Sequence, residues 1–575
     1  MKLAHKMDVV PTLFLVAVSI VLGLPMLLHG SSIDGHDTTE HLNFMKHFSE
    51  QFWRGDLYPR WLTNMNTGLG SPSYFVFPPF PAYVYVMLDP LARVFHFNAF
   101  NVAAWLPLLS SGITALLWLQ TFVNKTIATL CAALYMLMPY HLTIDFYRRC
   151  AISECWALVW MPLLLYFTIG VIAGKRRDLI GLAISFALMI FSHLISVAMF
   201  FWIPIVLAML LSRPGKRIRS GIRLVLAMVL GTCISSVYLL PALANAKYFP
   251  ASRLMKDGGY YQLEDKLVFF GSGLLLHSMH VTFLQAVSWT VVTMVMVIAI
   301  CVPVALKWTA HDSKIVVLFW IAVCSFSVFM TSRLSWQLWD HIHPLHDAIQ
   351  FPWRFNGLLC IGALALIAMF LANVSREVRP IRIAYTSSLI LVIIIWLGAS
   401  CNVYLRNKAD VPSGPRNEEP SISDNDGWLL AWIAPGTQQR TSLIASSGPK
   451  VRFREGGGST QLLSWNPRHI ELQTQSSTGG WIMINQLYFP TWEAELIDQG
   501  KRAMIRPAMP EGLIEVQAPP GNQRIEIDIP VSRTEYMGRW LSVLSLLYCL
   551  ILCFSKKAER PLLVVPWSAQ ARPPN

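Results

Sequence analysis

The chain has 575 residues, of which 54% are hydrophobic and only 14% are charged. A typical soluble protein has roughly 25% charged residues, so this composition excludes an ordinary soluble enzyme and places most of the chain in a lipid bilayer. The net charge of +13 does not indicate nucleic-acid binding, because the lysines and arginines gather in short segments between apolar runs. This distribution is the positive-inside pattern of membrane proteins.

Apolar runs of spanning length predict a polytopic α-helical membrane protein with about twelve transmembrane helices. One span needs about twenty apolar residues. The run at 179–211 is too long for one helix and has basic clusters on both sides, so we expect two short helices there. The first run is interpreted as an uncleaved anchor. The expected spans are 9–28, 101–122, 127–144, 156–173, two within 179–211, 224–244, 281–306, 315–331, 357–371, 385–400 and 540–554.

The basic segments between these runs predict the orientation. If they all face the cytoplasm, the spans alternate consistently, both termini are cytoplasmic and residues 402–539 lie outside. The segment Tyr74–Phe97 would break this alternation if it crossed the membrane, and its prolines interrupt a helix. We therefore interpret it as a broken, interfacial or re-entrant helix, and a version with thirteen helices is the alternative.

The chain divides into three predicted parts. Residues 1–400 form a transmembrane module with a first outer loop at 29–100, residues 401–539 form an outer β-rich domain, and residues 540–575 form the last helix and a cytoplasmic tail. Within the β-rich domain, residues 410–458 have the composition of a linker with loops. Regularly spaced short strands then predict a small β-sandwich without a catalytic constellation, so its expected role is binding or a structural cap. The predicted strands are Arg468–Gln473, Trp481–Gln486, Trp492–Asp498, Gly512–Gln517 and Arg524–Ile529.

The first outer loop begins with a dense group of ionisable side chains. These are Asp34, His36, Asp37, Glu40, His41 and His47. From Asp37 onward the apolar residues recur with a helical period, which places Asp37, Glu40 and His41 on one face. A carboxylate beside an imidazole can act as a general base or contribute to a metal site. The alternative is a capped helix that rests on the membrane surface.

A second outer stretch, FYRRCAISE, carries Arg148 and Arg149 on the side of the membrane where basic residues are rare. Basic side chains there suit a phosphate or anionic lipid headgroups. The alternative is that one of these arginines pairs with Asp145 or Glu154.

The third outer stretch, residues 336–355, contains Arg354, and His341, His343 and His346 beside Asp347. Histidines at this spacing can bind a metal ion, although histidines are also common where a protein meets the membrane surface.

These stretches together resemble a known family. The motifs GHDTTEH, RGDLYPRW, GLGSPSYFVFPPFPAY, FYRRCAISE and IQFPWRF are similar to those of the bacterial 6-pyruvoyl-tetrahydropterin-synthase-related membrane proteins. Despite that label, the family is similar to YfhO-like proteins and to the GT-C superfamily of polytopic glycosyltransferases. The resemblance covers nearly the whole chain, including LYFPTWEAELIDQGKR and GLIEVQAPPGNQRIEI in the outer domain, and it implies a GT-C-like module over residues 1–400.

The resemblance implies an inverting glycosyltransferase. Such an enzyme transfers a sugar from a polyprenyl-phosphate donor to a glycan, lipid or protein acceptor at the outer face of the bacterial inner membrane, with the β-rich domain in the periplasm. The acceptor hydroxyl loses its proton as it attacks the anomeric carbon, so a carboxylate is needed as base. The leaving phosphate gains negative charge, which arginines stabilise.

The resemblance also implies roles for individual residues. The implied catalytic residues are Asp37, with Asp34 as the alternative carboxylate, and His41. The implied substrate-binding residues are Glu40, Arg60, Arg148, Arg149, Glu154, Trp353 and Arg354. No cofactor is implied with certainty; a divalent metal ion is the one candidate, and its candidate ligands are Asp37, Glu154, His343, His346 and Asp347.

Two other functions are compatible with a polytopic membrane protein. A lipid or polysaccharide transporter would carry charges within its spans and paired inverted repeats, whereas the predicted spans here are nearly free of charge. A non-catalytic envelope-assembly protein would use the β-rich domain as its working part. Release of the carrier from a polyprenyl-phosphate sugar separates the enzyme from both alternatives.

Overall fold

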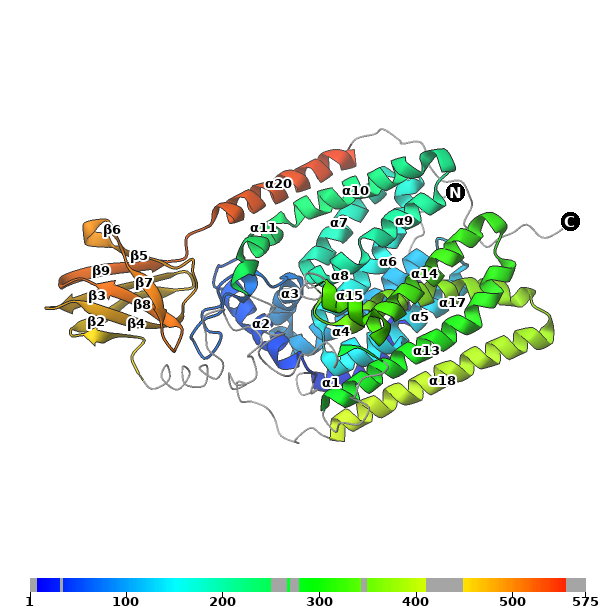
Figure 1. Cartoon of the computed structure of the whole chain (residues 1–575), viewed down its shortest axis with the longest axis horizontal. Coiled ribbons are helices and arrows are strands. Elements are labelled where there is room, and N and C mark those ends of the chain that lie inside the picture. Colours follow the sequence, from blue (N-terminus) through cyan, green and yellow to red (C-terminus); the bar gives the residue numbers. More distant parts are fainter. Residues whose placement is uncertain are drawn as a thin grey trace.

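The computed structural model describes residues 8–30, 35–249, 266–268, 279–342, 349–409 and 448–554. An elongated bundle of helices carries a β-domain at one end, which we call the β-domain side (Figure 1). Ten helical segments among the described residues are long and apolar enough to cross a membrane, or eleven if one bent pair forms a single span. This confirms the predicted class, a polytopic helical membrane protein with a C-terminal β-domain.

The helices on the N-terminal half are α1 (Val9–His29), α2 (Thr38–Phe52), α3 (Phe80–Phe95), α4 (Ala99–Leu119), α5 (Lys125–Leu137), α6 (Ile152–Ile172), α7 (Arg176–Ser192), α8 (Leu194–Phe200), α9 (Trp202–Leu211), α10 (Arg217–Ile234) and α11 (Ser236–Asn245). Those that follow are α13 (Met279–Trp308), α14 (Lys314–Thr331), α15 (Trp336–His341), α17 (Asn356–Asn373), α18 (Arg379–Ala409) and α20 (Arg533–Phe554).

The run at 179–211 is divided into two helical parts, as predicted, but only one of them counts among the candidate spans, so the number of candidate spans among the described residues falls below the predicted twelve. The run forms α7, a helix of 17 residues, and then α8 and α9 after a break at His193, whose backbone is extended with φ −160°. Only the second part, Leu194–Leu211, counts among the candidate spans. The bent pair consists of α10 and α11, which meet at an angle of 75°.

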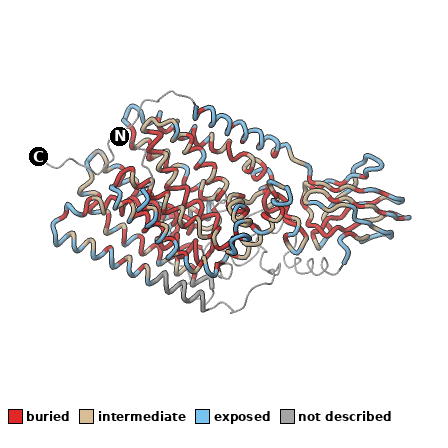
Figure 2. The backbone as a smooth tube through the Cα atoms, turned by 180° about the vertical axis from the view of Figure 1, so that it is seen from behind, coloured by how far each residue is buried: buried red, intermediate tan, exposed pale blue. Residues whose placement is uncertain are grey.

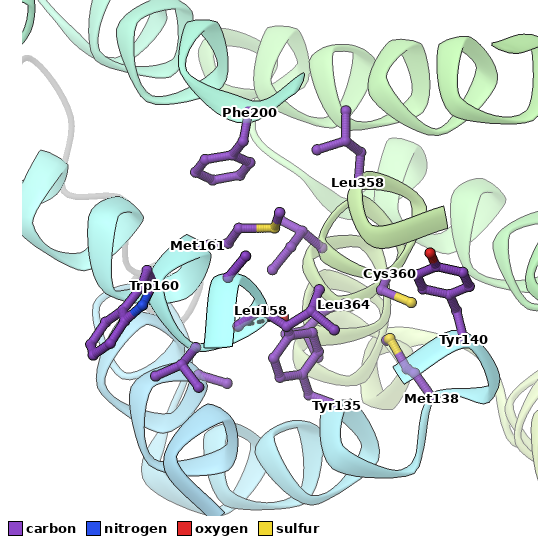
Figure 3. Packing of buried hydrophobic residues seen from close by; sticks show 14 of the residues in the cluster. Tyr135, Met138, Tyr140, Leu158, Trp160, Met161, Phe200, Leu358, Cys360 and Leu364 are labelled. Carbon is purple, nitrogen blue, oxygen red and sulfur yellow. Dashed lines mark hydrogen bonds between the residues drawn. The ribbon is translucent and has the colours of Figure 1, made fainter. Parts of the chain in front are cut away.

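Small residues allow the central helices to pack closely. In the candidate span Pro352–Arg376, which contains α17, 89% of the apolar segment is buried inside the protein. In Arg379–Gly398 of α18 the buried share is only 17%. A Cβ atom at Gly362 would lie 2.5 Å from Cys324 Sγ on α14, so this crossing requires glycine. Figure 2 shows the buried residues at the centre of the bundle, and Figure 3 shows Tyr135, Leu158 and Leu364 packed together there.

The segment Tyr74–Phe97 contains only one α-helix, α3, which has 16 residues and includes Pro90. It is not among the candidate spans of the described residues. Ser49 Oγ on α2 donates a hydrogen bond of 2.9 Å to Asp89 Oδ2 on α3, which joins the two helices. The first outer loop therefore contributes two packed helices on the β-domain side (Figure 1).

The β-domain is a sandwich of two antiparallel sheets with the orders β1-β4-β8-β7 and β2-β3-β9-β5-β6. All five predicted strands are present, as β3, β4, β5, β8 and β9. The sequence did not indicate the other four, and β1 lies in the stretch interpreted as linker, of which residues 410–447 are outside the described residues. The strands are β1 (Val451–Gly456), β2 (Ser459–Asn466), β3 (His469–Ser476), β4 (Gly480–Leu487), β5 (Glu493–Leu496), β6 (Lys501–Ala503), β7 (Ile505–Ala508), β8 (Leu513–Ala518) and β9 (Gly521–Asp528).

The first outer loop enters the core of this sandwich. Trp61, Leu69 and Phe75 are at most 2% exposed and belong to the same apolar cluster as the inward-facing residues of both sheets. Leu487 N donates to Leu69 O at 2.7 Å. The β-domain therefore completes its core with residues from a distant part of the sequence.

Candidate active site

A buried group of charged side chains is centred on Arg149. The guanidinium Nη1 lies 2.7 Å from Asp145 Oδ1 and 2.7 Å from Glu154 Oε2. Asp145 and Arg149 belong to the π-helical segment Tyr140–Arg149, and Glu154 lies in the first turn of α6. Between them Cys150 adopts a left-handed conformation with φ 54°, which reverses the chain so that both carboxylates face one arginine.

The first outer loop brings Asp37 to this group. The backbone N–H groups of His36 and Asp37 donate to the carbonyls of Arg148 and Arg149 at 3.2 and 2.8 Å. Arg149 Nη2 then lies 3.7 Å from Asp37 Oδ2. A Cβ atom at Gly35 would come within 2.8 Å of Cys150 Cβ, so the close approach of the two chains requires glycine there.

Asp37 differs from the other carboxylates in its exposure. Its side chain is 36% exposed, whereas those of Asp145 and Glu154 are at most 4% exposed. Asp37 is also the N-cap residue of α2. Asp37 is thus the one carboxylate of these three that is open to solvent.

His41 lies one helical turn after Asp37 and is buried. Burial lowers the pKa of the His41 imidazole below its ordinary value; the Asp37 carboxylate opposes this shift and Arg149 reinforces it. The imidazole is therefore neutral near pH 7. It packs against the edge of Phe77 at 6.0 Å between ring centroids.

Arg354 reaches the same group from the third outer stretch. Its Nε lies 3.4 Å from Glu154 Oε2, and its Nη1 donates to Ile349 O at 2.7 Å. Its guanidinium lies 4.9 Å from the ring centroid of Phe351, on which Trp353 stacks at 4.5 Å. Glu154 is therefore shared by two arginines.

Tyr140 is a third side chain in contact with Glu154. Its hydroxyl donates to Glu154 Oε1 at 2.8 Å. The sequence did not single out Tyr140 as a functional residue, and it mentioned Asp145 only as a partner for an arginine. The spacing of Asp145 and Arg149, four residues apart, was the available signal for that pair. No local pattern indicated Tyr140.

The structure brings together Asp37, His41, Arg149, Glu154, Trp353 and Arg354. The pairing expected as the alternative for Arg149, with Asp145 or Glu154, is present. Glu40 lies in the first turn of α2, and the backbone carbonyl of Arg148 accepts from His36. Asp34, His343, His346 and Asp347 lie outside the described residues.

Arg149 stands between Asp37 and Glu154, two of the candidate metal ligands. Among the described residues, neither carboxylate belongs to a set of three His, Cys, Asp or Glu side chains close enough to share a metal ion. In the described part of this site, the carboxylates are therefore paired with arginine and are not arranged as a set of metal ligands.

Arg60 lies apart from this group, in a second buried cluster. It is 2% exposed, and its Nε lies 3.1 Å from Oε2 of Glu535, which is 1% exposed at the start of α20. Arg468, the residue immediately before β3, also binds Glu535 at 3.0 Å. Arg60 Nη2 donates to Val237 O at 2.6 Å. We call Arg60, Glu535 and Arg468 the latch, because they join the outer loop, α20 and the β-domain.

Comparisons with known proteins give one family and several distant structures. No curated protein matches the chain. The arabinofuranosyltransferase AftD from Mycobacteria aligns at 14% identity and a TM-score of 0.42, over 70% of this chain and 27% of its own. The oligosaccharyltransferase AglB from Archaeoglobus fulgidus, in complex with an inhibitory peptide and a dolichol-phosphate, aligns at 13% identity and a TM-score of 0.38, over 68% of this chain and 56% of its own. ArnT from Cupriavidus metallidurans, bound to undecaprenyl phosphate, aligns at 13% identity and a TM-score of 0.29, over 64% of this chain and 81% of its own.

The family match covers more than half of the sequence. Residues 74–407 match the family described as "6-pyruvoyl-tetrahydropterin synthase related domain; membrane protein". These residues include the Arg149 and Arg354 segments and end before the β-domain. The chain therefore belongs to the 6-pyruvoyl-tetrahydropterin-synthase-related family of membrane proteins.

Proposed function

We propose that this protein is an inverting glycosyltransferase that takes its sugar from a polyprenyl-phosphate carrier. The observation that carries the proposal is one accessible carboxylate, Asp37, held 3.7 Å from a buried arginine that two further carboxylates fix in place. A transfer of this kind needs a base for the acceptor and positive charge for the leaving phosphate, and both lie side by side here.

In the proposed reaction the acceptor hydroxyl oxygen forms a bond to the anomeric carbon while the bond from that carbon to the phosphate oxygen breaks. Asp37 takes the hydroxyl proton. The electron pair of the broken bond leaves with the phosphate, whose growing charge Arg149 and Arg354 stabilise. Attack from the side opposite the phosphate inverts the anomeric configuration.

The remaining charged groups act on the arginines. Asp145 and Glu154 hold the Arg149 guanidinium, and Glu154 also faces Arg354. Each arginine keeps N–H groups beyond these contacts, because a guanidinium has five donors. A fixed guanidinium needs no reorganisation when charge develops on the phosphate, which is the main source of electrostatic catalysis.

The proposed location is the bacterial inner membrane, with the β-domain in the periplasm and both termini in the cytoplasm. The positive-inside pattern of the basic segments supports this orientation. The acceptor is a glycan, lipid or protein of the cell envelope. Asp37 serves as the base in this proposal, and a divalent ion bound to Asp37 is the alternative role for the same carboxylate.

The test is release of the carrier from a polyprenyl-phosphate sugar by the purified protein. Asp37→Asn keeps the shape of the side chain but removes the base, and loss of a general base typically costs roughly 10²–10⁴ in rate. The matched control is Asp340→Asn, which changes an exposed carboxylate at the end of α15. Chelator treatment that abolishes release would favour the metal role of Asp37.

Normal turnover by a folded Asp37→Asn variant would contradict the assignment. Absence of any carrier release by the wild type, with a range of sugars and acceptors, would favour a transporter or an envelope-assembly protein instead.

A further inference from the structure

The β-domain carries a separate group of metal-ligating side chains on adjacent strands. His469 is the first residue of β3 and pairs directly with Asp528, the last residue of β9. Glu526 lies two residues before Asp528 and therefore points to the same face of the sheet. The group lies beside the membrane module, because Arg468 of the latch immediately precedes His469 and the chain runs from Asp528 into α20.

The three side chains already converge on a small volume. His469 Nδ1 lies 2.8 Å from Asp528 Oδ1 and 3.2 Å from Glu526 Oε1. All three ligand atoms lie within 4.8 Å of one another. In a tetrahedral zinc site with bonds of about 2.0–2.1 Å, ligand atoms are about 3.3 Å apart. The strand register therefore places the His469 nitrogen at 2.8 and 3.2 Å from the two carboxylate oxygens, close to the separations around a zinc ion.

The charges on this face also favour a cation. Across the sheet, Glu526 lies opposite Glu471 on one side and Glu495 on the other, and Asp528 lies opposite Glu493. Arg524 pairs with Glu471 and Arg502 pairs with Glu493, so the repulsion that remains is mainly between Glu526, Asp528 and Glu495. Like charges directly opposite one another destabilise a sheet. In the described part of the chain, the ion pairs of Glu526 and Asp528 both go to the shared His469. A divalent ion would offset this repulsion.

We propose that His469, Glu526 and Asp528 bind one divalent transition-metal ion of the zinc class. A mixed set of one imidazole and two carboxylates suits zinc better than magnesium or calcium, which prefer oxygen ligands alone. The ion joins β3 to β9 at the end of the sandwich next to the latch. Three protein ligands leave one coordination position for water. The proposal is independent of the glycosyl transfer proposed above.

The experiment is a calorimetric titration of the purified full-length protein with Zn²⁺, after treatment with a chelator. We expect one strong site per chain in the wild type and at least a tenfold weaker affinity in His469→Gln and Asp528→Asn. Even the partners that only orient a metal ligand typically contribute 10–100-fold to affinity. The matched control is His47→Gln, because His47 on α2 faces a single carboxylate, Glu50, at 3.4 Å.

A second measurement separates this site from unspecific binding to other histidines. Co²⁺ in a site with low coordination number gives visible absorption, and we expect these bands in the wild type and the His47→Gln protein but not in the His469→Gln protein. Thermal unfolding in the presence of chelator shows whether each variant is folded.

Two results would overturn the proposal. One is a wild-type protein that binds no stoichiometric Zn²⁺, which would leave His469 paired only with the two carboxylates. The other is a folded His469→Gln protein that binds Zn²⁺ as tightly as the wild type. Neither result bears on carrier release at Asp37.

Discussion

The latch gives the sharpest prediction about stability. In Glu535→Gln the side chain keeps its size but loses its charge, and Arg60 stays buried at 2% exposure. Its guanidinium then retains Val237 O and the Tyr58 ring, 3.9 Å away, but no anion among the described residues. Removing one partner of a buried ion pair typically costs 3–5 kcal/mol. We expect a loss of about 3 kcal/mol, because the amide oxygen of Gln can still accept a hydrogen bond.

The assay is chemical unfolding of the β-domain in detergent, followed by tryptophan fluorescence. Trp61 and Trp492 are two of the 21 tryptophans, and both are at most 2% exposed in the core of the sandwich, with ring centroids 5.2 Å apart. The part of the emission change that is lost in a Trp492→Phe background therefore reports on that core. The matched control is Glu493→Gln. Its pair with Arg502 has nearly the same length, 3.2 Å, but both side chains are largely exposed. Such pairs contribute less than about 1 kcal/mol.

A double variant tests the reason for the effect. In Arg60→Met with Glu535→Leu neither charge of the fully buried pair remains, and Arg468, which is 20% exposed, keeps its hydrogen bonds to Ile529 O and Pro530 O. The double variant should therefore be more stable than Glu535→Gln alone. A Glu535→Gln protein within about 1 kcal/mol of the wild type would refute the reasoning. So would a Glu493→Gln protein that loses as much stability as Glu535→Gln.

Two further predictions concern the candidate active site. Arg149→Lys keeps the charge but loses the planar guanidinium, in which Nη1 holds Asp145 and Glu154 while Nη2 faces Asp37, so carrier release should fall by about 10²-fold or more; an unchanged rate would contradict the role of Arg149. His41 has a pKa lowered by burial, so the folded protein takes up this proton less readily than the unfolded chain. The free energy of unfolding should therefore fall as the pH drops below about 6.5, because the unfolded chain takes up a proton there that buried His41 resists. In His41→Gln the free energy of unfolding should change less between about pH 7.5 and 5.

Much of the architecture follows from local sequence patterns. Apolar runs predict where helices cross the membrane, because the bilayer selects length and hydropathy and both are local properties. The five strands that the sequence predicted in the β-domain alternate buried and exposed residues or have clear turns beside them. The strand β1 was missed because its sequence, VRFREG, is polar and lies in a stretch rich in glycine and serine. The break at His193 was also not located, since no proline or glycine marks it.

The candidate site was predictable in part. The helix after Asp37 and the pairing of Arg149 with Asp145 follow from spacings of four residues or fewer, within reach of one helical turn. The motifs also indicated Glu154 and Arg354 as separate candidates. Their contact at 3.4 Å depends on how α6 packs against the segment before α17, which no local pattern encodes.

Arg60 and Trp61 show most clearly what only the tertiary structure decided. Both belong to the RGDLYPRW motif beside the Asp37 helix, and the sequence suggested a role for Arg60 in substrate binding. In the folded protein Arg60 pairs with Glu535, and Trp61 Nε1 donates to Gln486 Oε1 at 2.8 Å, more than four hundred residues along the chain. Burying a charge or an indole N–H costs free energy unless the group is paired or hydrogen-bonded, and this requirement follows from the residue types in the sequence. Which partner satisfies it depends on which distant segments meet, and that depends on the packing of the whole chain.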